Sequence, residues 1–388
     1  MPPGSSAPLY TRAFIALTAT ELLYFTATGM SLYALPLFVT GPLGGDEAGA
    51  GLAVGAFAVS ALVLRPFAGR LSDRVGRRPL ILGGALLAAV ALALLLVAAH
   101  LAVVVLLRLL AGVAEAAFFV AIFAAVADLA PPERTGEALS INSLGLYLGL
   151  TFGPPLAEAL LGFGGFPTVW IGATALALAG AGLGLLVGET STARTPPGAP
   201  LHILHRPAVP ISLGFLTALI AMGGYLAFAS LHAQSIGVPN ASLALLTFGA
   251  VVVVCRIAFA RVPDRLPSLP LGASALAGIA AGLVIAAAWQ DLAGLLVGAA
   301  VLGVGVAYST PAFFSAVFAT AAPNERGLAS GTASAAIDLG LGIGPILLGL
   351  VAASSGIAWA FAVGALVALA GAAWTLGLAH RTRSRAAG

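Results

Sequence analysis

The sequence has 388 residues, of which 60% are hydrophobic and only 8% are charged. Its mean hydropathy is +1.07, which excludes a soluble globular protein of this length because such a protein needs more polar surface to cover its core. The pI of about 9.4 does not indicate a nucleic acid partner, since the basic residues lie in short segments between apolar runs. We therefore expect a membrane protein.

Apolar runs of about 20 residues recur along the chain, and a helix of that length crosses the roughly 30 Å of hydrocarbon in a bilayer. Backbone groups in lipid must pair within helices or closed barrels, and the alternating pattern of barrel strands is absent. The sequence therefore predicts an all-α polytopic membrane protein. We expect twelve spanning helices, at about 12–39, 47–67, 79–99, 101–128, 136–161, 166–188, 208–233, 239–262, 268–289, 291–321, 327–353 and 356–379.

The arginines provide an independent test of this number of spans. All 17 basic residues are arginine, and with twelve spans all but Arg108 fall at or beyond the helix ends on one side of the membrane. The positive-inside rule then predicts that both termini are cytoplasmic. The alanine- and glycine-rich, lysine-free composition suggests the codon bias of a GC-rich bacterial genome, and we therefore expect the bacterial inner membrane as the location. The opposite loops contain no arginine: Gly41–Glu47, the turn at His100, Gly162–Pro167, Ser235–Asn240, Gln290–Asp291 and Ser354–Gly356.

The two halves of the chain are related by a shift of 191 residues. The shift places Arg65, Arg70, Asp73 and Arg74 on Arg256, Arg261, Asp264 and Arg265, and Gly149, Gly153 and Pro154 on Gly340, Gly344 and Pro345. A constant shift implies two duplicated six-helix units, an arrangement that forms a substrate path between the repeats in many transporters. We predict pseudo-symmetric bundles at 1–188 and 208–388, joined by a cytoplasmic linker at 189–207.

The loop after the second span reads Gly69-Arg-Leu-Ser-Asp73-Arg-Val-Gly76-Arg-Arg-Pro79. It resembles the cytoplasmic signature loop of the major facilitator superfamily, and the span number and the repeat extend this resemblance over the whole chain. The resemblance implies a transporter that works by alternating access. It also implies that Asp73 helps to latch the two halves at the cytoplasmic face, together with Asp128 at the end of the fourth span. The alternative is that the arginines only set topology. The candidate gate residues are Gly69, Asp73, Arg74, Gly76, Arg77, Arg78 and Asp128.

Two further segments resemble family motifs in part. Arg108-Leu-Leu-Ala-Gly112 resembles the buried-arginine motif of proton-coupled members, and Gly149-Leu-Thr-Phe-Gly153-Pro154 resembles the antiporter motif of drug:proton exporters. The second favours export, although Ala157 and Glu158 stand where that motif has paired glycines. Close helix packing by the glycines and simple bending by proline are the alternatives. The candidate bending and gating residues are Gly149, Gly153, Pro154, Gly344 and Pro345.

Ionisable residues inside the spans indicate a functional site, because each costs about 2.5–3.5 kcal/mol at the centre of a membrane helix. Glu21, Glu115 and Asp338 lie near the middle of their spans, and Arg108 precedes Glu115 by two helical turns on the same face. A carboxyl group away from water can bind a proton, and movement of a nearby arginine can release it. The alternative is a static ion pair. The candidate proton-coupling and cavity residues are Glu21, Arg108, Glu115 and Asp338, with Glu158 a weaker candidate.

We therefore expect a monomeric, proton-driven exporter of small amphipathic compounds, with the substrate, protons and the lipid bilayer as its partners. A proton symporter or uniporter that imports a sugar or another metabolite is the alternative. We expect no enzyme activity, metal or cofactor, since the serine, histidine and acidic residues in the spans are scattered. The chain also lacks a Gly-Lys-Ser/Thr phosphate-binding loop, which argues against direct use of ATP.

Overall fold

A computed structural model describes residues 10–131, 134–190, 204–259, 265–322 and 326–387. Every regular element in these ranges is a helix, which confirms the prediction of an all-α protein. Ten of the helices are long and apolar enough to cross a membrane. Large apolar side chains remain exposed on their surfaces, among them Val63, Leu106 and Leu366 at 58%, 64% and 65%. Such exposure suits contact with lipid.

The helices of the first half agree closely with the predicted spans. They are α1 (Arg12–Thr40), α2 (Glu47–Val75), α3 (Arg77–Leu94) with the short 3-10 helix η1 (Leu95–Val97), α4 (Leu101–Leu129) and α5 (Thr135–Gly184). The 50 residues of α5 include two predicted spans. Non-helical backbone angles at Gly164 and Gly165 separate them, and the φ of +72° at Gly165 is one that glycine adopts readily.

The helices of the second half follow after the linker. They are the 3-10 helix η3 (Arg206–Ala208), α6 (Val209–Ser235), α7 (Leu243–Ala258), α9 (Ser268–Ala288), α10 (Leu292–Phe318), α11 (Arg326–Ser355) and α12 (Ile357–Ala387). Helix α7 is shorter than the span predicted at 239–262, whose last residues lie outside the described ranges. Most of the predicted linker, and Arg261 and Asp264 of the second loop copy, also lie outside them.

The chain forms two compact units. Unit 1 comprises Met1–Ala34 with Ser60–Ala199, and unit 2 comprises Leu35–Val59 with Pro200–Gly388. Residues 35–59 belong to unit 2, whereas the repeat assigns them to the bundle at 1–188. The reason is that Gly51 and Gly55 of α2 lie directly against the backbone of α11 at Pro345 and Gly342.

In each unit, glycines bring together the two helices that are equivalent under the repeat. In unit 1, a Cβ atom on Gly149 would lie 2.7 Å from the carbonyl carbon of Phe25, and one on Gly153 would lie 2.6 Å from the carbonyl oxygen of Thr26. Helix α5 therefore lies against the backbone of α1. In unit 2, the equivalent Gly340 and Gly344 lie against Leu219 and Ile220 of α6. The repeat in the sequence thus corresponds to a repeated helix contact.

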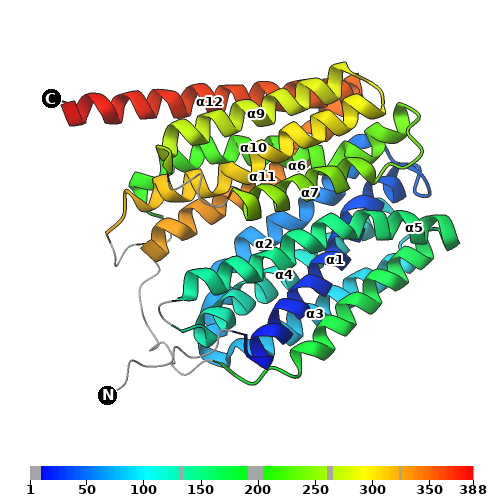
Figure 1. Ribbon diagram of the computed structural model, residues 1–388. Coiled ribbons are helices and arrows are strands. Elements are labelled where there is room, and N and C mark those ends of the chain that lie inside the picture. The colour runs from blue at the N-terminus through cyan, green and yellow to red at the C-terminus, as the bar shows by residue number, and fades with distance from the viewer. Residues whose placement is uncertain (1–9, 132–133, 191–203, 260–264, 323–325, 388) are drawn as a thin grey trace. The chain divides into compact units, whose positions relative to one another are not determined.

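The other helices of unit 2 form a layered bundle. Helix α9 contacts both α10 and α12, and these three run side by side in Figure 1. The glycines Gly282 and Gly298 bring α9 and α10 close, because a Cβ on Gly282 would lie 2.6 Å from the carbonyl oxygen of Gly298. Small residues at helix crossings are the usual means of packing in membranes.

The α1–α5 contact generates a test of stability. We expect Gly153→Leu to destabilise the protein by about 1–3 kcal/mol or more, because the added side chain overpacks a backbone contact. Gly162→Leu on the same helix is the matched control, since nothing lies within 4 Å of a Cβ at Gly162. Thermal unfolding of the purified protein measures both, and equal midpoints for the two variants would contradict this account of the packing.

Candidate functional site

Two acidic residues and one arginine are buried inside unit 1. Helix α1 provides Glu21, which is fully buried, and α4 provides Arg108 and Glu115, which are 8% and 4% exposed. Buried charges are stable only when they are paired, hydrogen-bonded or neutralised. The neighbours of these three side chains therefore decide what the site can do.

Glu115 interacts with each of the other two residues and with Tyr24. The carboxyl groups of Glu21 and Glu115 are close enough to repel each other when both are ionised. The Tyr24 hydroxyl donates a hydrogen bond to Glu115, and the charge of Arg108 acts on both of these groups. Neither carboxylate oxygen of Glu21 has a hydrogen-bond partner among the described residues. We call Glu21, Tyr24, Arg108 and Glu115 the carboxylate network.

Aromatic rings surround the carboxylate network. The Tyr24 ring stacks on Phe118 with centroids 3.9 Å apart and 9° between the planes. The guanidinium of Arg65 lies 4.6 Å above the ring of Phe119, the next residue of α4. The rings keep water away, and electrostatic interactions are stronger in such surroundings. A cation held over a ring face adds a further favourable interaction.

The remaining predicted acids lie elsewhere. Asp338 is 4% exposed on α11 and therefore belongs to unit 2. Glu158 of α5 accepts a hydrogen bond of 2.9 Å from the Tyr33 hydroxyl of α1. The structure thus brings together Glu21, Arg108 and Glu115 of the predicted set. Among the described residues, no group of three or more histidine, cysteine or acidic side chains is placed to hold a metal ion.

Tyr24 and Arg65 were missed as members of this site. Sequence reasoning did not include Tyr24 among the candidate residues and treated Arg65, like the other arginines, as a topology signal. The sequence does contain a signal for Tyr24, which follows Glu21 by three residues and therefore lies on the same helix face. No comparable signal exists for Arg65, because its contact with Phe119 depends on how α2 packs on α4.

Arg77 is the centre of the predicted gate loop. Its side chain forms ion pairs with Asp73 and, at 3.3 Å, with Asp128, and it donates a 3.0 Å hydrogen bond to the Ser72 hydroxyl. These bonds connect the C-terminal ends of α2 and α4 to the start of α3. Arg74 is exposed, and a Cβ on Gly69 would have room, with Val120 at 3.9 Å.

Glu189 at the end of the sixth predicted span completes this loop. Its carboxylate accepts hydrogen bonds from the backbone amides of Arg77, at 2.8 Å, and Arg78, at 3.2 Å. It therefore caps the N-terminus of α3, where a negative charge is favoured. Gly76 has a φ of +110°, and a Cβ atom there would collide with the Glu189 carboxylate. The next residue, Thr190, donates to Asp128 at 3.2 Å.

The chain matches known transporters along its full length. The family model described as Major Facilitator Superfamily matches residues 17–321 and 273–388. An MFS-type transporter of Burkholderia mallei (strain SAVP1) is 28% identical, over 98% of this chain and 95% of that protein.

Solved structures share the fold. A bacterial homolog of the human lysosomal transporter Spinster, in an inward-facing and occupied conformation, has a TM-score of 0.76 at 17% identity, covering 97% of this chain and 98% of that one. The human organic anion transporter MFSD10 has a TM-score of 0.70 at 18% identity, covering 94% and 99%. The chain therefore belongs to the Major Facilitator Superfamily and is a multi-pass membrane transporter.

Proposed function

We propose that the chain is a proton-coupled exporter of small amphipathic compounds. The observation that supports this proposal is the carboxylate network of unit 1. Two carboxyl groups lie side by side away from water, and only one of them, Glu115, has a tyrosine donor and an arginine beside it. A group that exchanges protons in a membrane needs such an environment.

The network suggests how one proton is held and released. Two ionised carboxylates close together in apolar surroundings repel strongly, so the buried pair favours a state with at least one proton bound. Tyr24 and Arg108 stabilise the ionised form of Glu115 by hydrogen bonding and charge, which leaves Glu21 as the group that holds the proton. A rearrangement that separates Arg108 from Glu115 shifts this balance. Proton binding is in this way linked to conformation, as alternating access requires.

The direction of transport is proposed from the segment Gly149–Pro154. Its resemblance to the antiporter motif favours export, in which a proton enters as a substrate leaves. In this proposal Gly149, Gly153 and Pro154, with Gly344 and Pro345 in the second repeat, guide helix movement at their close contacts. Import of a sugar or metabolite by symport or uniport is the second candidate, because Ala157 and Glu158 replace the paired glycines of that motif and weaken the case for export.

The substrate class is proposed from the aromatic side of α4. Phe119 and Phe123 are half-buried and stack with centroids 4.5 Å apart, which suits an apolar or aromatic part of a substrate. The nearby charges suit a polar part. The fold does not select the cargo, since it is shared with a transporter of organic anions.

The remaining parts of the proposal concern the whole protein. The arginine distribution supports an inner-membrane location with both termini in the cytoplasm. We expect a monomer without enzyme activity. Asp338 in unit 2 is a further candidate for the substrate path, because it is a buried acid within a membrane helix.

We expect Glu115→Gln and Glu21→Gln each to reduce pH-driven transport about tenfold or more, the effect of losing roughly 1.4 kcal/mol of coupling. Either change removes a proton site and keeps the size of the side chain. The measurement is substrate-dependent proton flux in proteoliposomes with an imposed pH gradient, screened with drug-like cations and with sugars. Exchange of substrate without a gradient should persist in both variants.

Glu137→Gln is the matched control for these variants, since Glu137 is an exposed acid of unit 1 that pairs with Arg134 at 2.8 Å. It should transport normally. Full pH-driven transport by Glu115→Gln would remove Glu115 as a proton-coupling residue. Proton flux coupled to sugar uptake, and not to drug release, would support the import alternative.

The latch proposal for the gate loop is tested by Asp73→Asn. In this proposal Gly69, Asp73, Arg74, Gly76, Arg77, Arg78 and Asp128 control the cytoplasmic closure of the transporter. We expect lower transport at unchanged membrane abundance, because the substitution weakens the ion pair with Arg77. Flux normalised to protein amount in membranes measures this effect. Normal transport would show that the loop serves topology alone.

A further inference from the structure

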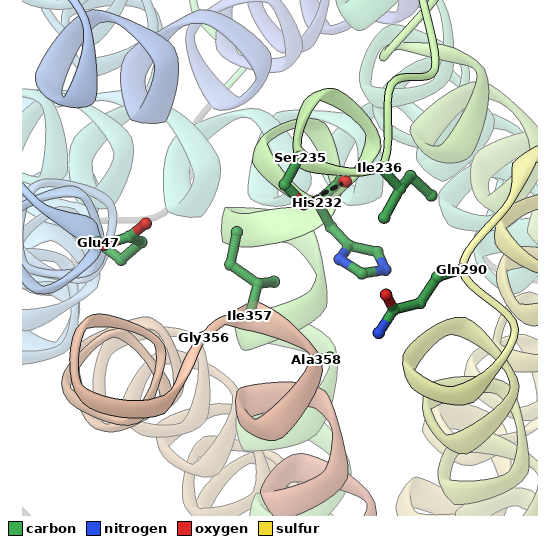
Figure 2. A pocket seen from close by; sticks show the side chains of 8 residues that line it. All are labelled: Glu47, His232, Ser235, Ile236, Gln290, Gly356, Ile357 and Ala358. Carbon is green, nitrogen blue, oxygen red and sulfur yellow. Dashed lines mark hydrogen bonds between the residues drawn. The ribbon is translucent and has the colours of Figure 1, made fainter.

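Unit 2 contains a cavity of about 270 Å³ that the proposed function does not use. It lies where α6 ends, between the start of α12, the turn before α10 and the first residue of α2. Every one of these segments belongs to the face that lacks arginine, which the positive-inside rule places outside the cell. Figure 2 shows its lining residues: Glu47, His232, Ser235, Ile236, Gln290, Gly356, Ile357 and Ala358.

His232 is the most deeply buried polar group of this cavity, at 2% exposure. Its Nε2 atom lies 3.0 Å from the carbonyl oxygen of Ala286. A carbonyl oxygen only accepts hydrogen bonds, so Nε2 carries the hydrogen of the neutral ring. The Nδ1 atom then presents a lone pair, and it has no hydrogen-bond partner among the described residues.

The neighbouring polar groups also present acceptors. The Ser235 hydroxyl donates its hydrogen to the carbonyl oxygen of His232 at 2.8 Å, and the Gln290 amide nitrogen donates to Ala287 at 3.1 Å. Their oxygen atoms keep free lone pairs. Glu47 adds a carboxylate opposite the histidine ring (Figure 2). An occupant that supplies hydrogen-bond donors therefore fits these acceptors.

The charge of the lining favours a cation. Glu47 is the one charged side chain among the eight lining residues. Asp291 lies beside Gln290, where the backbone amide of Gly294 and the Trp289 indole lower the pKa of its carboxyl group, and it remains ionised at neutral pH. Its oxygens already accept 2.9 Å bonds from these two donors. The N-terminus of α12, at Ile357 and Ala358, also borders the cavity, and its helix dipole opposes this field in part.

We propose that this cavity is an outward-facing binding site for a small organic ammonium ion with N–H donors. The ammonium group donates to the Glu47 carboxylate, to Nδ1 of His232 and to the Gln290 or Ser235 oxygen. The apolar part of the ion lies against Ile236 and Ile357. The site is independent of the direction of transport and of the carboxylate network, which belongs to unit 1.

The test uses the full chain in lipid nanodiscs with ¹⁵N-labelled histidine. The probe is benzylammonium, and benzyltrimethylammonium is the matched cation without N–H donors. His232→Gln identifies the His232 resonance among the five histidines. We expect benzylammonium to shift the Nδ1 signal of His232 in a saturable manner, and benzyltrimethylammonium neither to shift it nor to compete.

Two variants of adjacent acids separate a specific site from general attraction. Glu47→Gln should weaken benzylammonium binding about tenfold or more, because a hydrogen bond to a charged partner is lost. Asp46→Asn removes the same charge one residue away and should bind normally, since Asp46 is outside the cavity and caps α2 through the amide of Gly49 at 2.8 Å. Equal weakening by both variants would contradict the proposal.

Other results would also overturn it. Equal binding of benzyltrimethylammonium would show that N–H donors are not needed. A saturable shift of the His232 signal by acetate instead would show that the cavity binds anions. No saturable shift with benzylammonium would show that the cavity does not bind this class of ion. Thermal unfolding confirms that each variant is folded. Because binding is measured without transport, failure of this proposal is distinguishable from failure of proton-coupled export.

Discussion

The cost of a charge away from water is the constraint on which the functional part of this structure depends. Glu21, Arg108 and Glu115 are buried among aromatic rings, where an isolated ion is unstable. Each must therefore find a proton, a donor or an opposite charge within unit 1. The carboxylate network meets this requirement with few spare partners, and neither carboxylate oxygen of Glu21 has a hydrogen-bond partner among the described residues. The proposed link between proton binding and helix movement depends on this scarcity of partners.

The two repeats differ at this site although they share their packing. The shift of 191 residues that relates the glycines of α5 and α11 also relates the network to Ser212, Phe215, Ala299 and Val306. The second repeat has an aromatic core at this place, where Phe215 stacks on Phe313 at 5.3 Å. The backbone contacts are thus common to both units, while the charges are specific to one. In the proposed function, proton coupling is therefore confined to one of two units that share the same framework.

Local patterns were sufficient to predict most of the fold. Hydropathy located the spans because a membrane helix satisfies its own backbone groups, and the shared shift aligned Gly149 with Gly340, which make equivalent contacts in the structure. The sequence also predicted the turn at Gly162–Pro167, and the structure places the break at Gly164 and Gly165. The assignment of residues 35–59 to unit 2 was not predicted, because it depends on contacts of α2 with a helix about 290 residues later.

The candidate site was predicted in part for the same reason. Arg108 and Glu115 share a helix, so their spacing revealed them, whereas the contact between Glu21 and Glu115 requires two helices to pack. Glu189 was unpredictable, since it binds amides 112 residues away in the chain. Contacts between side chains of different helices leave no periodic pattern in the sequence.

The cap that Glu189 places on α3 has a consequence for biosynthesis. A ribosome makes Arg77 and Arg78 long before Glu189, so the first amides of α3 receive this carboxylate only after the sixth span has been synthesised. The hydrogen bond from Thr190 to Asp128 also forms only after this point in synthesis. The end of the first half that carries the predicted gate loop therefore acquires these bonds when that half is complete in length, before the second half has been translated. One acidic residue directly after the sixth predicted span thus marks the completion of the first repeat.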